Sequence, residues 1–441
     1  MKRMVQRSTW KLLPILTSVL VSITIFSNIR NAWSLEGKRE DDESITSILL
    51  SNISCQNLFD GEEQEAAMAK MLQVNSSSII DAILDSSDSC NTIEKLFRFF
   101  PTLSAEENDF PIAYAMLVHK DVIQVMMLLS ALYQLQNQFC IAVDGNSNER
   151  FWNVLRKLAS CYSNIQIFRV KKIEWCSFGI IEAVFDCVVR LANSTLQWNY
   201  IQILSGVDAP LKTNLESVRI LKALNGSFNT EILPFERYRL HGKRAKRSPL
   251  PLVKSSMSVV FSREAANFMV ANQVVHEQLT FLKGTICPDE SFWATIAGNP
   301  HKLAMPGGFD AKEFLRRKFG KNYAKWWFRA NVGPWITPPN TSKIELQEQK
   351  PFLDNYVISR YQQWQIRPNS RCRGRYYRLS CIFGVDDLPI LVRRHELVAH
   401  KLYIDFQPAA FLCLIREIRQ RSLHPVQFDA NIYKNLPDGP I

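Results

Sequence analysis

The sequence predicts an α/β protein whose mostly parallel sheet has flanking helices and follows a membrane anchor and a stem. Three observations support this prediction. Short apolar runs typical of buried strands alternate with stretches of helical period after Phe110-Pro111. Strands joined by such helices pair in parallel, because each helix returns the chain to the same edge of the sheet. Near the N-terminus, an uncharged run is long enough to cross a membrane.

The composition is that of a globular protein. The chain has 441 residues, of which 46% are hydrophobic and 22% charged, which is enough for one large domain or two smaller ones and excludes disorder throughout. The net charge of +11 suits nucleic acid, an anionic membrane surface or a phosphate-bearing substrate, since each attracts clustered Lys and Arg. Charge alone does not distinguish these partners.

Residues 12–29 form the uncharged run, and four basic residues precede it: Lys2, Arg3, Arg7 and Lys11. Because a positive flank stays cytoplasmic, we expect residues 1–11 to be a cytoplasmic tail, residues 12–29 a signal-anchor helix, and the chain from residue 30 onward to be lumenal. The alternative is a cleaved signal peptide with a weak cleavage region at Asn31-Ala32-Trp33-Ser34. The 18-residue apolar length favours the anchor.

Cysteines and sequons also indicate the secretory route. All ten cysteines follow residue 30, where oxidising conditions allow disulfides, and none lies in a C-x-x-C or other zinc-like arrangement. Five N-x-S/T sequons, which are glycosylated only on that route, begin at Asn52, Asn75, Asn193, Asn225 and Asn340. Together with the anchor, these features predict a lumenal domain.

From residue 30 to about residue 107 the chain is polar, rich in serine and acidic in places, as at Glu40-Asp41-Asp42-Glu43. Short amphipathic pieces occur at 66–72 and 79–84. We interpret residues 30–107 as a stem that holds a folded domain, residues 108–441, away from the membrane.

The folded domain begins with the alternating strand and helix pattern. Its strand-like runs are 112–118, 139–143, 165–170 and 200–204, and its helix-like stretches are 122–135, 149–160 and 178–191. Ligands of such sheets bind beyond the carboxyl ends of the strands, which here are followed by His119-Lys120, Asp144-Gly145 and Ser205-Gly206-Val207-Asp208. The chain contains no G-x-G-x-x-G and no P-loop motif, so NAD binding and P-loop nucleotide binding lose support.

Pro288-Asp289-Glu290 opens a predicted helix, since proline suits the first turn and carboxylates suit the positive end of the helix dipole. One interpretation is plain helix capping, because acidic first turns are common. The other is that one of these carboxylates is a general base beside a substrate. Spacing alone does not decide between them.

A basic run near the C-terminus spans Arg371 to Arg378, and Arg393-Arg394-His395 and Lys401 follow it. With its two adjacent tyrosines the run superficially resembles a nucleic-acid-binding face, although a lumenal location argues against that partner. Arginine and lysine also bind diphosphates, and a solvated basic surface needs no ligand. A second basic cluster, His241 to Ser248, is expected to be an exposed loop.

Six segments resemble, in order and spacing, the core-2/I-branching β-1,6-N-acetylglucosaminyltransferase family. They are FPIAYAMLVH (Phe110 to His119), FCIAVD (Phe139 to Asp144), LASCYSNI (Leu158 to Ile165), ILSGVDAPLKTNLE (Ile203 to Glu216), CPDESFWATI (Cys287 to Ile296) and RLSCIFGVDDL (Arg378 to Leu388). The PDE-x-x-WATI and SG-x-D-x-P-L-K-T-N-L-E blocks are specific together, and the others are supportive. The resemblance extends from about residue 108 to the C-terminus.

The resemblance implies a GT-A-like, Rossmann-type α/β fold, a UDP-sugar donor and inversion at the anomeric carbon. Glu290 matches the family's catalytic base, and Arg378 and Lys401 match the two cations that hold the donor diphosphate. Four further matches are His119 and Asp144 at the uridine site, Trp175 where the family often has tyrosine near the nucleotide, and Glu216 at the acceptor.

These residue types fit the chemistry that the resemblance implies. A sugar hydroxyl is a poor nucleophile near neutral pH, so a carboxylate such as Glu290 must accept its proton. The departing UDP develops negative charge, which many GT-A enzymes neutralise with a divalent metal held by D-x-D. No D-x-D occurs in this sequence, and Arg378 and Lys401 match the cations that replace the metal in the resembled family. We therefore expect transfer without a metal or other cofactor.

The family's disulfide pattern implies the pairs Cys55–Cys413, Cys90–Cys161, Cys140–Cys187 and Cys372–Cys381. Cys176 and Cys287 remain, at positions where family members usually have other residues, and we hypothesise that they also pair. The chain departs from the family at Lys120, which replaces a second histidine after His119, and throughout residues 318–350. These departures leave the acceptor open.

The leading hypothesis is transfer of GlcNAc from UDP-GlcNAc to a glycan 6-hydroxyl, forming β-1,6 branches on O-linked, mucin-type glycans, by a type II protein of the Golgi membrane. A second hypothesis keeps the mechanism with another UDP-sugar, because xylosyl- and glucuronosyltransferase-like relatives share parts of the motif set. A third is a catalytically silent lumenal glycan-binding protein, against which the intact Glu290, Arg378 and Lys401 argue. A nucleic-acid-binding protein would explain the charge but not the anchor or the sequons.

Overall fold

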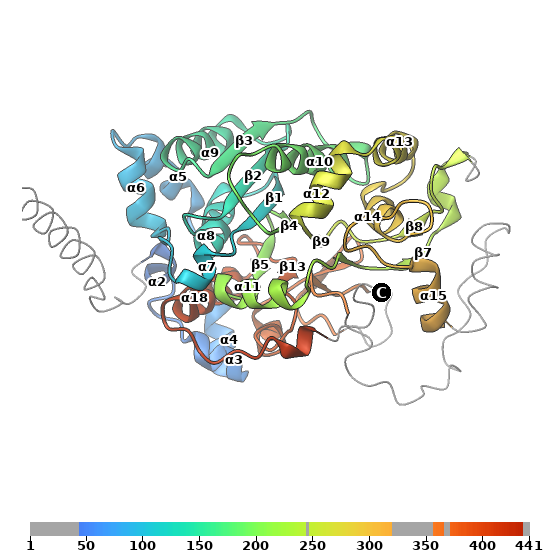
Figure 1. Ribbon diagram of the computed structural model, residues 1–441. Coiled ribbons are helices and arrows are strands. Elements are labelled where there is room, and N and C mark those ends of the chain that lie inside the picture. The colour runs from blue at the N-terminus through green and yellow to red at the C-terminus, as the bar shows by residue number, and fades with distance from the viewer. Residues whose placement is uncertain (1–43, 244–246, 320–355, 366–370, 435–441) are drawn as a thin grey trace, which may run out of the picture. The chain divides into compact units, whose positions relative to one another are not determined.

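The computed structural model describes residues 44–243, 247–319, 356–365 and 371–434. They include a central six-stranded sheet with helices on both faces (Figure 1). The predicted anchor, residues 12–29, and the sequon at Asn340 lie outside the described residues. Within the described part of the chain, no helix is both long and apolar enough to cross a membrane.

The central sheet has the strand order β3-β2-β1-β4-β9-β6. Its strands are β1 (Ile112–Val118), β2 (Gln138–Val143), β3 (Ile165–Arg169), β4 (Tyr200–Ser205), β6 (Asn229–Thr230) and β9 (Val259–Ser262). The first four pair in parallel, and β9 lies antiparallel between β4 and β6. The prediction of a mostly parallel sheet is therefore confirmed, and the four predicted strands match β1 to β4 to within one residue at each end.

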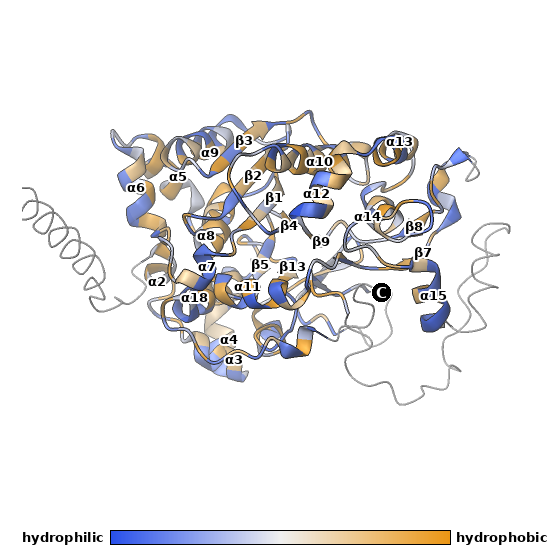
Figure 2. Ribbon diagram, in the orientation of Figure 1, coloured by the Kyte–Doolittle hydropathy of each residue, from blue (hydrophilic) through white to orange (hydrophobic). Residues whose placement is uncertain are grey.

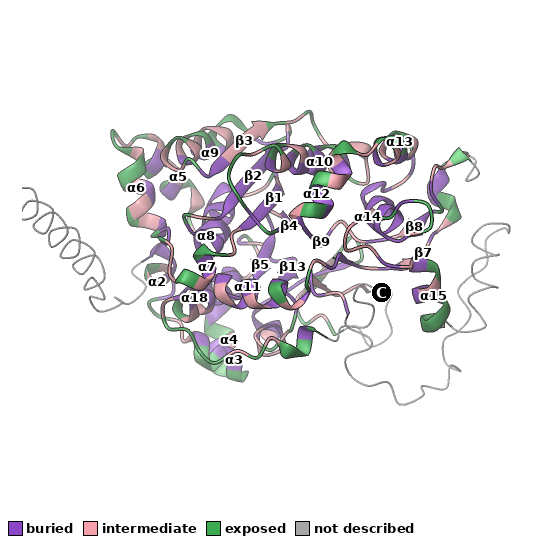
Figure 3. Ribbon diagram, viewed as in Figure 1, coloured by how far each residue is buried: buried purple, intermediate pink, exposed green. Residues whose placement is uncertain are grey.

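Alternation along the strands divides the core into two layers. Ile112, Tyr114 and Met116 of β1 join one apolar cluster, whereas Ala113 and Ala115 join the other. Successive side chains of a strand point to opposite faces, so a run that is apolar throughout is buried on both sides. The central strands are accordingly hydrophobic in Figure 2 and buried in Figure 3.

Helices on both faces of the sheet complete these layers. One layer contains α8 (Val122–Leu132), α9 (Glu149–Cys161), α11 (Asn214–Ala223) and α18 (Pro408–Leu423). The other contains α10 (Phe178–Ala192), α12 (Arg263–Ala271), α13 (Gln273–Leu282), α14 (Asp289–Ala297) and α15 (Ala311–Phe319). The three helices predicted between the first strands are therefore present as α8, α9 and α10.

A second sheet, with the order β10-β13-β5, follows the carboxyl end of β4. In it, β5 (Asp208–Pro210) pairs antiparallel with β13 (Val398–His400), and β13 pairs in parallel with β10 (Tyr361–Gln362). The hairpin of β11 (Arg375–Tyr377) and β12 (Ser380–Ile382) adjoins this sheet. The remaining elements are short: β7 (Leu233–Pro234), β8 (Val253–Lys254), α17 (Leu388–Leu391) and the 3₁₀ turns η1 (Arg237–Leu240), η4 (Val385–Asp387) and η5 (Asn431–Tyr433).

Most of the predicted stem that the structure describes is folded into this domain. Its helices are α2 (Ile45–Leu49), α3 (Cys55–Asp60), α4 (Glu63–Ala69), α5 (Ser76–Leu84), α6 (Ser89–Phe97) and α7 (Ala105–Asn108). Their apolar faces, including Leu58, Ile83 and Phe97, join the cluster that also contains α8 and α18. From Ser44 onward the segment is therefore a layer of the domain, in contrast to the expected spacer.

Local sequence explains why so polar a segment folds. Ser54, Asn75, Asp88 and Ser104 accept backbone N–H groups at the starts of α3, α5, α6 and α7, so the polar residues cap helices. Between these caps, apolar residues recur at the spacing of one helix face. The amino-acid composition of the segment contains no information on this spacing, and composition alone therefore predicts a stem.

All ten cysteines form disulfides, namely the four pairs that the resemblance implies and Cys176–Cys287. The asparagines of the four described sequons are exposed: Asn52, Asn75, Asn193 and Asn225. Both observations fit a domain that folds in the oxidising lumen of the secretory pathway.

A fragment that begins at Asp109 should misfold although it contains the whole sheet. It would expose the apolar surface that α2 to α7 cover and would leave Cys161 and Cys413 without their partners. Secretion from cultured cells, followed by non-reducing size-exclusion chromatography, measures the outcome. The matched control is a fragment that begins at Ser44, which should be secreted as one discrete species. Equal secretion of both fragments would show that the N-terminal helices are dispensable.

Candidate active site

Arg378 lies at the tip of the β11–β12 hairpin. Arg378 and Leu379 form its two-residue turn with φ angles of 49° and 64°, as in the primed turns that suit hairpins. The Cys372–Cys381 disulfide links the segment before β11 to β12. The Arg378 guanidinium lies over the rings of Trp175 and Tyr377, at 5.2 and 5.5 Å from their centroids. The hairpin thus presents an exposed cation between two aromatic side chains.

Lys401 lies beside this hairpin because it follows β13 directly. Its ammonium donates to the carbonyl oxygen of Tyr377 at 3.3 Å and lies 5.0 Å from the centroid of the Tyr377 ring. Burial, followed by the positive charges of Arg378, Lys120 and Arg360, lowers the pKa of Lys401 to about 8. Arg378 and Lys401 therefore form one cationic centre that an anion would stabilise.

Asp144 holds the loop that carries Trp175. Its buried carboxylate accepts the backbone N–H groups of Asn146 and Ile173, at 2.9 and 3.0 Å. The next residue must be glycine, because a Cβ at Gly145 would lie 2.8 Å from backbone atoms of the same loop. Trp175 itself is 68% exposed, which is unusual for so large an apolar ring. The loop therefore offers a preformed flat surface next to Arg378.

His119 lies beyond the end of β1, next to this loop. Its carbonyl oxygen accepts a hydrogen bond from the Ser147 hydroxyl at 3.3 Å. Desolvation lowers the pKa of His119, and the nearby Asp144 carboxylate only partly opposes this effect. The imidazole is therefore neutral at neutral pH and suited to hydrogen bonding rather than to charge pairing. The structure thus brings His119, Asp144, Trp175, Arg378 and Lys401 into one neighbourhood.

Glu290 lies in the first turn of α14, and its side chain is about one quarter exposed. Its Oε2 accepts a hydrogen bond from Nη2 of Arg239 at 2.6 Å. Arg239 is buried and is also paired with Glu236 at 2.7 Å. In the described part of the chain Oε1 has no hydrogen-bond donor, so one oxygen is held in place while the other can accept a proton.

Asp289, the neighbouring carboxylate, has different surroundings. It is 7% exposed, and burial together with the Glu290 charge raises the pKa of Asp289 to about 7. Its Oδ1 is buried without a hydrogen-bond partner among the described residues. Of the two candidates for a base, Glu290 is therefore the one whose carboxylate a substrate can reach.

Arg239 is the residue of this centre that sequence reasoning missed. It is separated from Glu290 by 51 residues and belongs to the short 3₁₀ turn η1, so neither periodicity nor a motif connects the two. Its neighbours Arg237 and Tyr238 resemble an ordinary polar surface in sequence. The only available signal was an acidic residue, Glu236, three positions before it.

The Cys176–Cys287 disulfide joins the two parts of the site. Cys176 follows Trp175, and Cys287 lies three residues before Glu290. The same two residues share a backbone hydrogen bond, from the Cys287 N–H to the Cys176 carbonyl oxygen at 3.1 Å. The loop beside the cationic centre is therefore covalently attached to the start of α14.

The structure does not bring Glu216 to these residues. It is buried at the start of α11, where it forms a capping box with Thr213 and an ion pair with Arg421 of α18 at 3.2 Å. Among the described residues, none of the other predicted site residues contacts its carboxylate. Its observed contacts are those of a helix cap, and its acceptor contact stays a prediction.

One group of potential metal-ligating side chains occurs in the described residues: Cys372, Cys381 and Asp387. Both sulfurs are bonded to each other in a disulfide, so neither is a thiolate that could hold a metal ion. Asp387 accepts backbone N–H groups from Arg373 and Gly384. This group is thus explained as part of the hairpin's attachment to η4.

Comparison with known proteins decides the family. The protein-family model described as Core-2/I-Branching enzyme matches residues 112–349, which include β1 to β4 and the start of α14 with Glu290. The chain belongs to the core-2/I-branching enzyme family. It is therefore a glycosyltransferase, and the resemblance seen in its sequence segments is confirmed.

Three curated relatives illustrate the similarity of this core-2/I-branching enzyme to others. A human protein named beta-1,3-galactosyl-O-glycosyl-glycoprotein beta-1,6-N-acetylglucosaminyltransferase is 28% identical over 86% of this chain and 87% of its own length. The mouse enzyme of that name numbered 4 is 27% identical over 84% of this chain and 80% of its own. The human enzyme numbered 3 is 28% identical over 75% of this chain and 73% of its own.

Binding of UDP, the nucleotide that the resemblance implies, should weaken above about pH 8. Because the pKa of Lys401 is lowered to about 8, its ammonium is present below that pH and is lost as the pH rises through it. We expect the dissociation constant to rise about tenfold from about pH 7 to about pH 9. Titration calorimetry measures it. A Lys401→Arg variant keeps its charge and should show no such rise; an equal rise in both proteins would assign the effect to another group.

Loss of the Cys176–Cys287 disulfide should disturb this core-2/I-branching enzyme more than loss of a disulfide remote from the site. In a Cys176→Ser/Cys287→Ser variant we expect the KM for the sugar donor to rise about tenfold, because small displacements of binding groups are costly. The control is Cys90→Ser/Cys161→Ser, which removes the α6–α9 disulfide. If both double variants showed the same rise in KM and the same loss of melting temperature, Cys176–Cys287 would contribute only to general stability.

Proposed function

We propose that the chain transfers GlcNAc from UDP-GlcNAc to the 6-hydroxyl of a glycan residue and so forms β-1,6 branches on O-linked, mucin-type glycans. The observation that carries this proposal is that one disulfide, Cys176–Cys287, joins two parts of the site. It links the start of α14, which carries the reachable carboxylate Glu290, to the loop beside the cationic centre of Arg378 and Lys401. The names of the curated relatives support the transferred sugar and the linkage.

In this mechanism Glu290 acts as the general base. Its Oε1 accepts the proton of the acceptor hydroxyl while the hydroxyl oxygen attacks the anomeric carbon of the donor. Arg239 holds the other oxygen of the carboxylate, at 2.6 Å, and so fixes its direction. Attack from the side opposite the diphosphate gives inversion at the anomeric carbon.

Arg378 and Lys401 act on the leaving group. As the bond between the anomeric carbon and the diphosphate oxygen breaks, its electron pair stays with UDP, and the developing negative charge needs nearby cations. The guanidinium and the ammonium supply them, and bound diphosphate would restore the pKa of Lys401 upward. We propose that transfer needs no divalent metal, and that His119, Asp144 and Trp175 lie along the uridine.

We also propose a GT-A-like, Rossmann-type fold and a type II location in the Golgi membrane. The parallel order β3-β2-β1-β4, with the site at the carboxyl ends of its strands, supports the fold assignment. The five disulfides support a lumenal catalytic domain, and the apolar run at residues 12–29 supports the anchor.

The test is transfer of radiolabelled sugar from several UDP-sugars to mucin-core and branched-lactosamine acceptors, with and without EDTA. We expect GlcNAc transfer that EDTA leaves unchanged. A Glu290→Gln variant should lower kcat by about 100-fold to 10,000-fold, because its amide cannot accept the proton. The matched control is Glu264→Gln, an exposed residue of α12, which should keep full activity.

Each result bears on a different part of the proposal. Transfer of another sugar would replace the donor and keep Glu290 as the base. Loss of transfer in EDTA that Mn²⁺ restores would contradict the metal-independent mechanism. Absence of transfer with every donor and acceptor would favour a glycan-binding protein without catalytic activity.

A further inference from the structure

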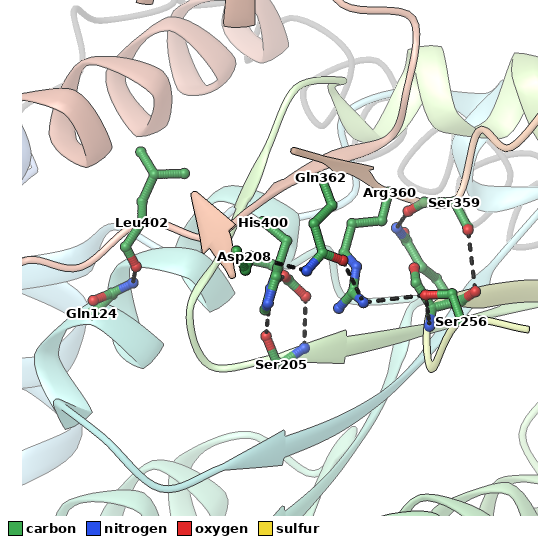
Figure 4. Close-up of polar contacts among 12 residues, drawn as sticks. Gln124, Ser205, Asp208, Ser256, Ser359, Arg360, Gln362, His400 and Leu402 are labelled. Atoms are coloured by element: carbon green, nitrogen blue, oxygen red, sulfur yellow. Dashed lines mark hydrogen bonds and ion pairs between the residues drawn. The ribbon is translucent and has the colours of Figure 1, made fainter. Parts of the chain in front are cut away.

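Arg360 has a fixed place between the two sheets. It directly precedes β10, whose Gln362 is paired with His400 of β13. The preceding residue, Ser359, is fully buried and donates its hydroxyl hydrogen bond to the Ser258 carbonyl oxygen at 3.3 Å. The backbone at Arg360 is therefore held on both sides, and Figure 4 shows its side chain between the His400–Asp208 pair and Ser256.

Among the described residues, the hydrogen-bond partners of the Arg360 guanidinium are neutral. Its Nη2 donates to the Ser256 hydroxyl at 3.2 Å and to Oε1 of Gln362 at 3.3 Å. In the part of the chain that the structure describes, no carboxylate forms an ion pair with it, although it is half-buried. Other arginines with little exposure do pair with acids, as Arg239 does with Glu290 and Arg394 with Glu396. A half-buried cation whose described hydrogen-bond partners are neutral is suited to bind an acceptor oxygen of a ligand.

The acid of this network, Asp208, has a hydrogen-bond partner at each of its oxygens. Asp208 is completely buried, with Oδ1 bonded to Nδ1 of His400 at 2.7 Å and Oδ2 accepting the Ser205 N–H at 2.7 Å. Burial, followed by the charge of Arg360, lowers the pKa of His400 to about 4, so the imidazole is neutral and donates to Asp208. Asp208 is therefore bonded to His400 and, among the described residues, forms no ion pair with Arg360.

The contacts of Arg360 extend to both halves of the site. Its partner Ser256 adjoins Ser255, whose backbone N–H donates to the carbonyl oxygen of Glu290 at 2.6 Å. Its other partner, Gln362, donates to the Ser380 hydroxyl at 3.0 Å, two residues beyond Arg378. The charge of Arg360 also reaches both halves, since it acts on Lys401 and on Asp289. Arg360 is thus connected to the surroundings of both the base and the diphosphate cations.

In an inverting transfer, the group between the base and the leaving diphosphate is the transferred sugar. We propose that Arg360 is a specificity residue that donates hydrogen bonds to an oxygen-bearing substituent of that sugar, either an amide carbonyl or a carboxylate. This inference rests on the proposed function. A planar guanidinium suits both substituents because each offers an exposed, strongly accepting oxygen. A donor sugar with only hydroxyl groups would gain less from it.

The test compares kcat/KM for UDP-GlcNAc, UDP-glucuronic acid and UDP-glucose in the full chain and in Arg360→Gln and Arg360→Lys variants. UDP-glucose is the reference, since it lacks both substituents. We expect Arg360→Gln to lower kcat/KM for the preferred donor by about 10-fold to 100-fold and that for UDP-glucose by less than about threefold. Arg360→Lys should retain part of the preference for the preferred donor over UDP-glucose that Arg360→Gln loses. In both variants the inhibition constant of UDP should stay within about twofold of the wild-type value.

The preferred donor identifies the substituent. If Arg360→Gln loses the preference for UDP-GlcNAc over UDP-glucose, Arg360 binds an amide carbonyl. If it loses a preference for UDP-glucuronic acid over UDP-glucose, Arg360 binds a carboxylate. Equal losses with all three donors overturn the proposal. So does a UDP inhibition constant that rises in parallel with KM, because Arg360 would then bind the diphosphate.

Two controls separate folding and activity from specificity. Arg393→Gln removes an exposed arginine and should change neither the donor ratios nor the melting temperature. If the wild-type chain transfers no sugar, the proposed function fails, and calorimetric binding of the three UDP-sugars relative to UDP then tests Arg360 by itself. In that case too, the assignment would be overturned if Arg360→Gln had the wild-type melting temperature and the wild-type ratios of UDP-sugar affinity to UDP affinity.

Discussion

The active site depends on the pairing of β13 with β5, two strands that lie nearly two hundred residues apart in sequence. The buried hydrogen bond between Asp208 and His400 joins their side chains, and the backbone register brings Ala399 opposite Ala209. Lys401 directly follows β13, and the hairpin that carries Arg378 forms backbone hydrogen bonds with Lys401. Arg360 directly precedes β10, which pairs with the other edge of β13. Without this pairing, the cations of the C-terminal region would have no fixed relation to the sheet that begins at β1.

The two halves of the site have opposite charge character. Around Glu290, the carboxylates of Glu290, Asp289 and Glu236 lie together, and the buried Arg239 pairs with Glu236 and Glu290. Around Lys401, cations outnumber carboxylates, and their mutual repulsion contributes to its lowered pKa. The first half suits proton removal and the second suits the binding of a dianion. The disulfide between Cys176 and Cys287 keeps these two environments at a constant separation.

Elements with a strong local pattern could be predicted from the sequence. The strands β1 to β4 are apolar runs bounded by turns, and α8 to α10 have clear helical periods, so their positions follow from side-chain chemistry alone. Glu290, Arg378 and Lys401 were predicted as site residues from motifs of the resembled family. Arg239 and Arg360 could not be found, because their importance arises from contacts between distant segments. Glu216 shows the opposite case, since its motif is present while its carboxylate caps a helix.

The disulfide between Cys55 and Cys413 spans a sequence separation of 358 residues, and this has a consequence for biosynthesis. At the usual rate of translation, roughly 20 to 70 s pass between the synthesis of the two cysteines. During that interval Cys55 has no native partner, because Cys413 and α18 have not yet been synthesised. The chain therefore completes this layer only after α18 has been synthesised, and until then the earlier cysteines must be protected from pairing with the wrong partner.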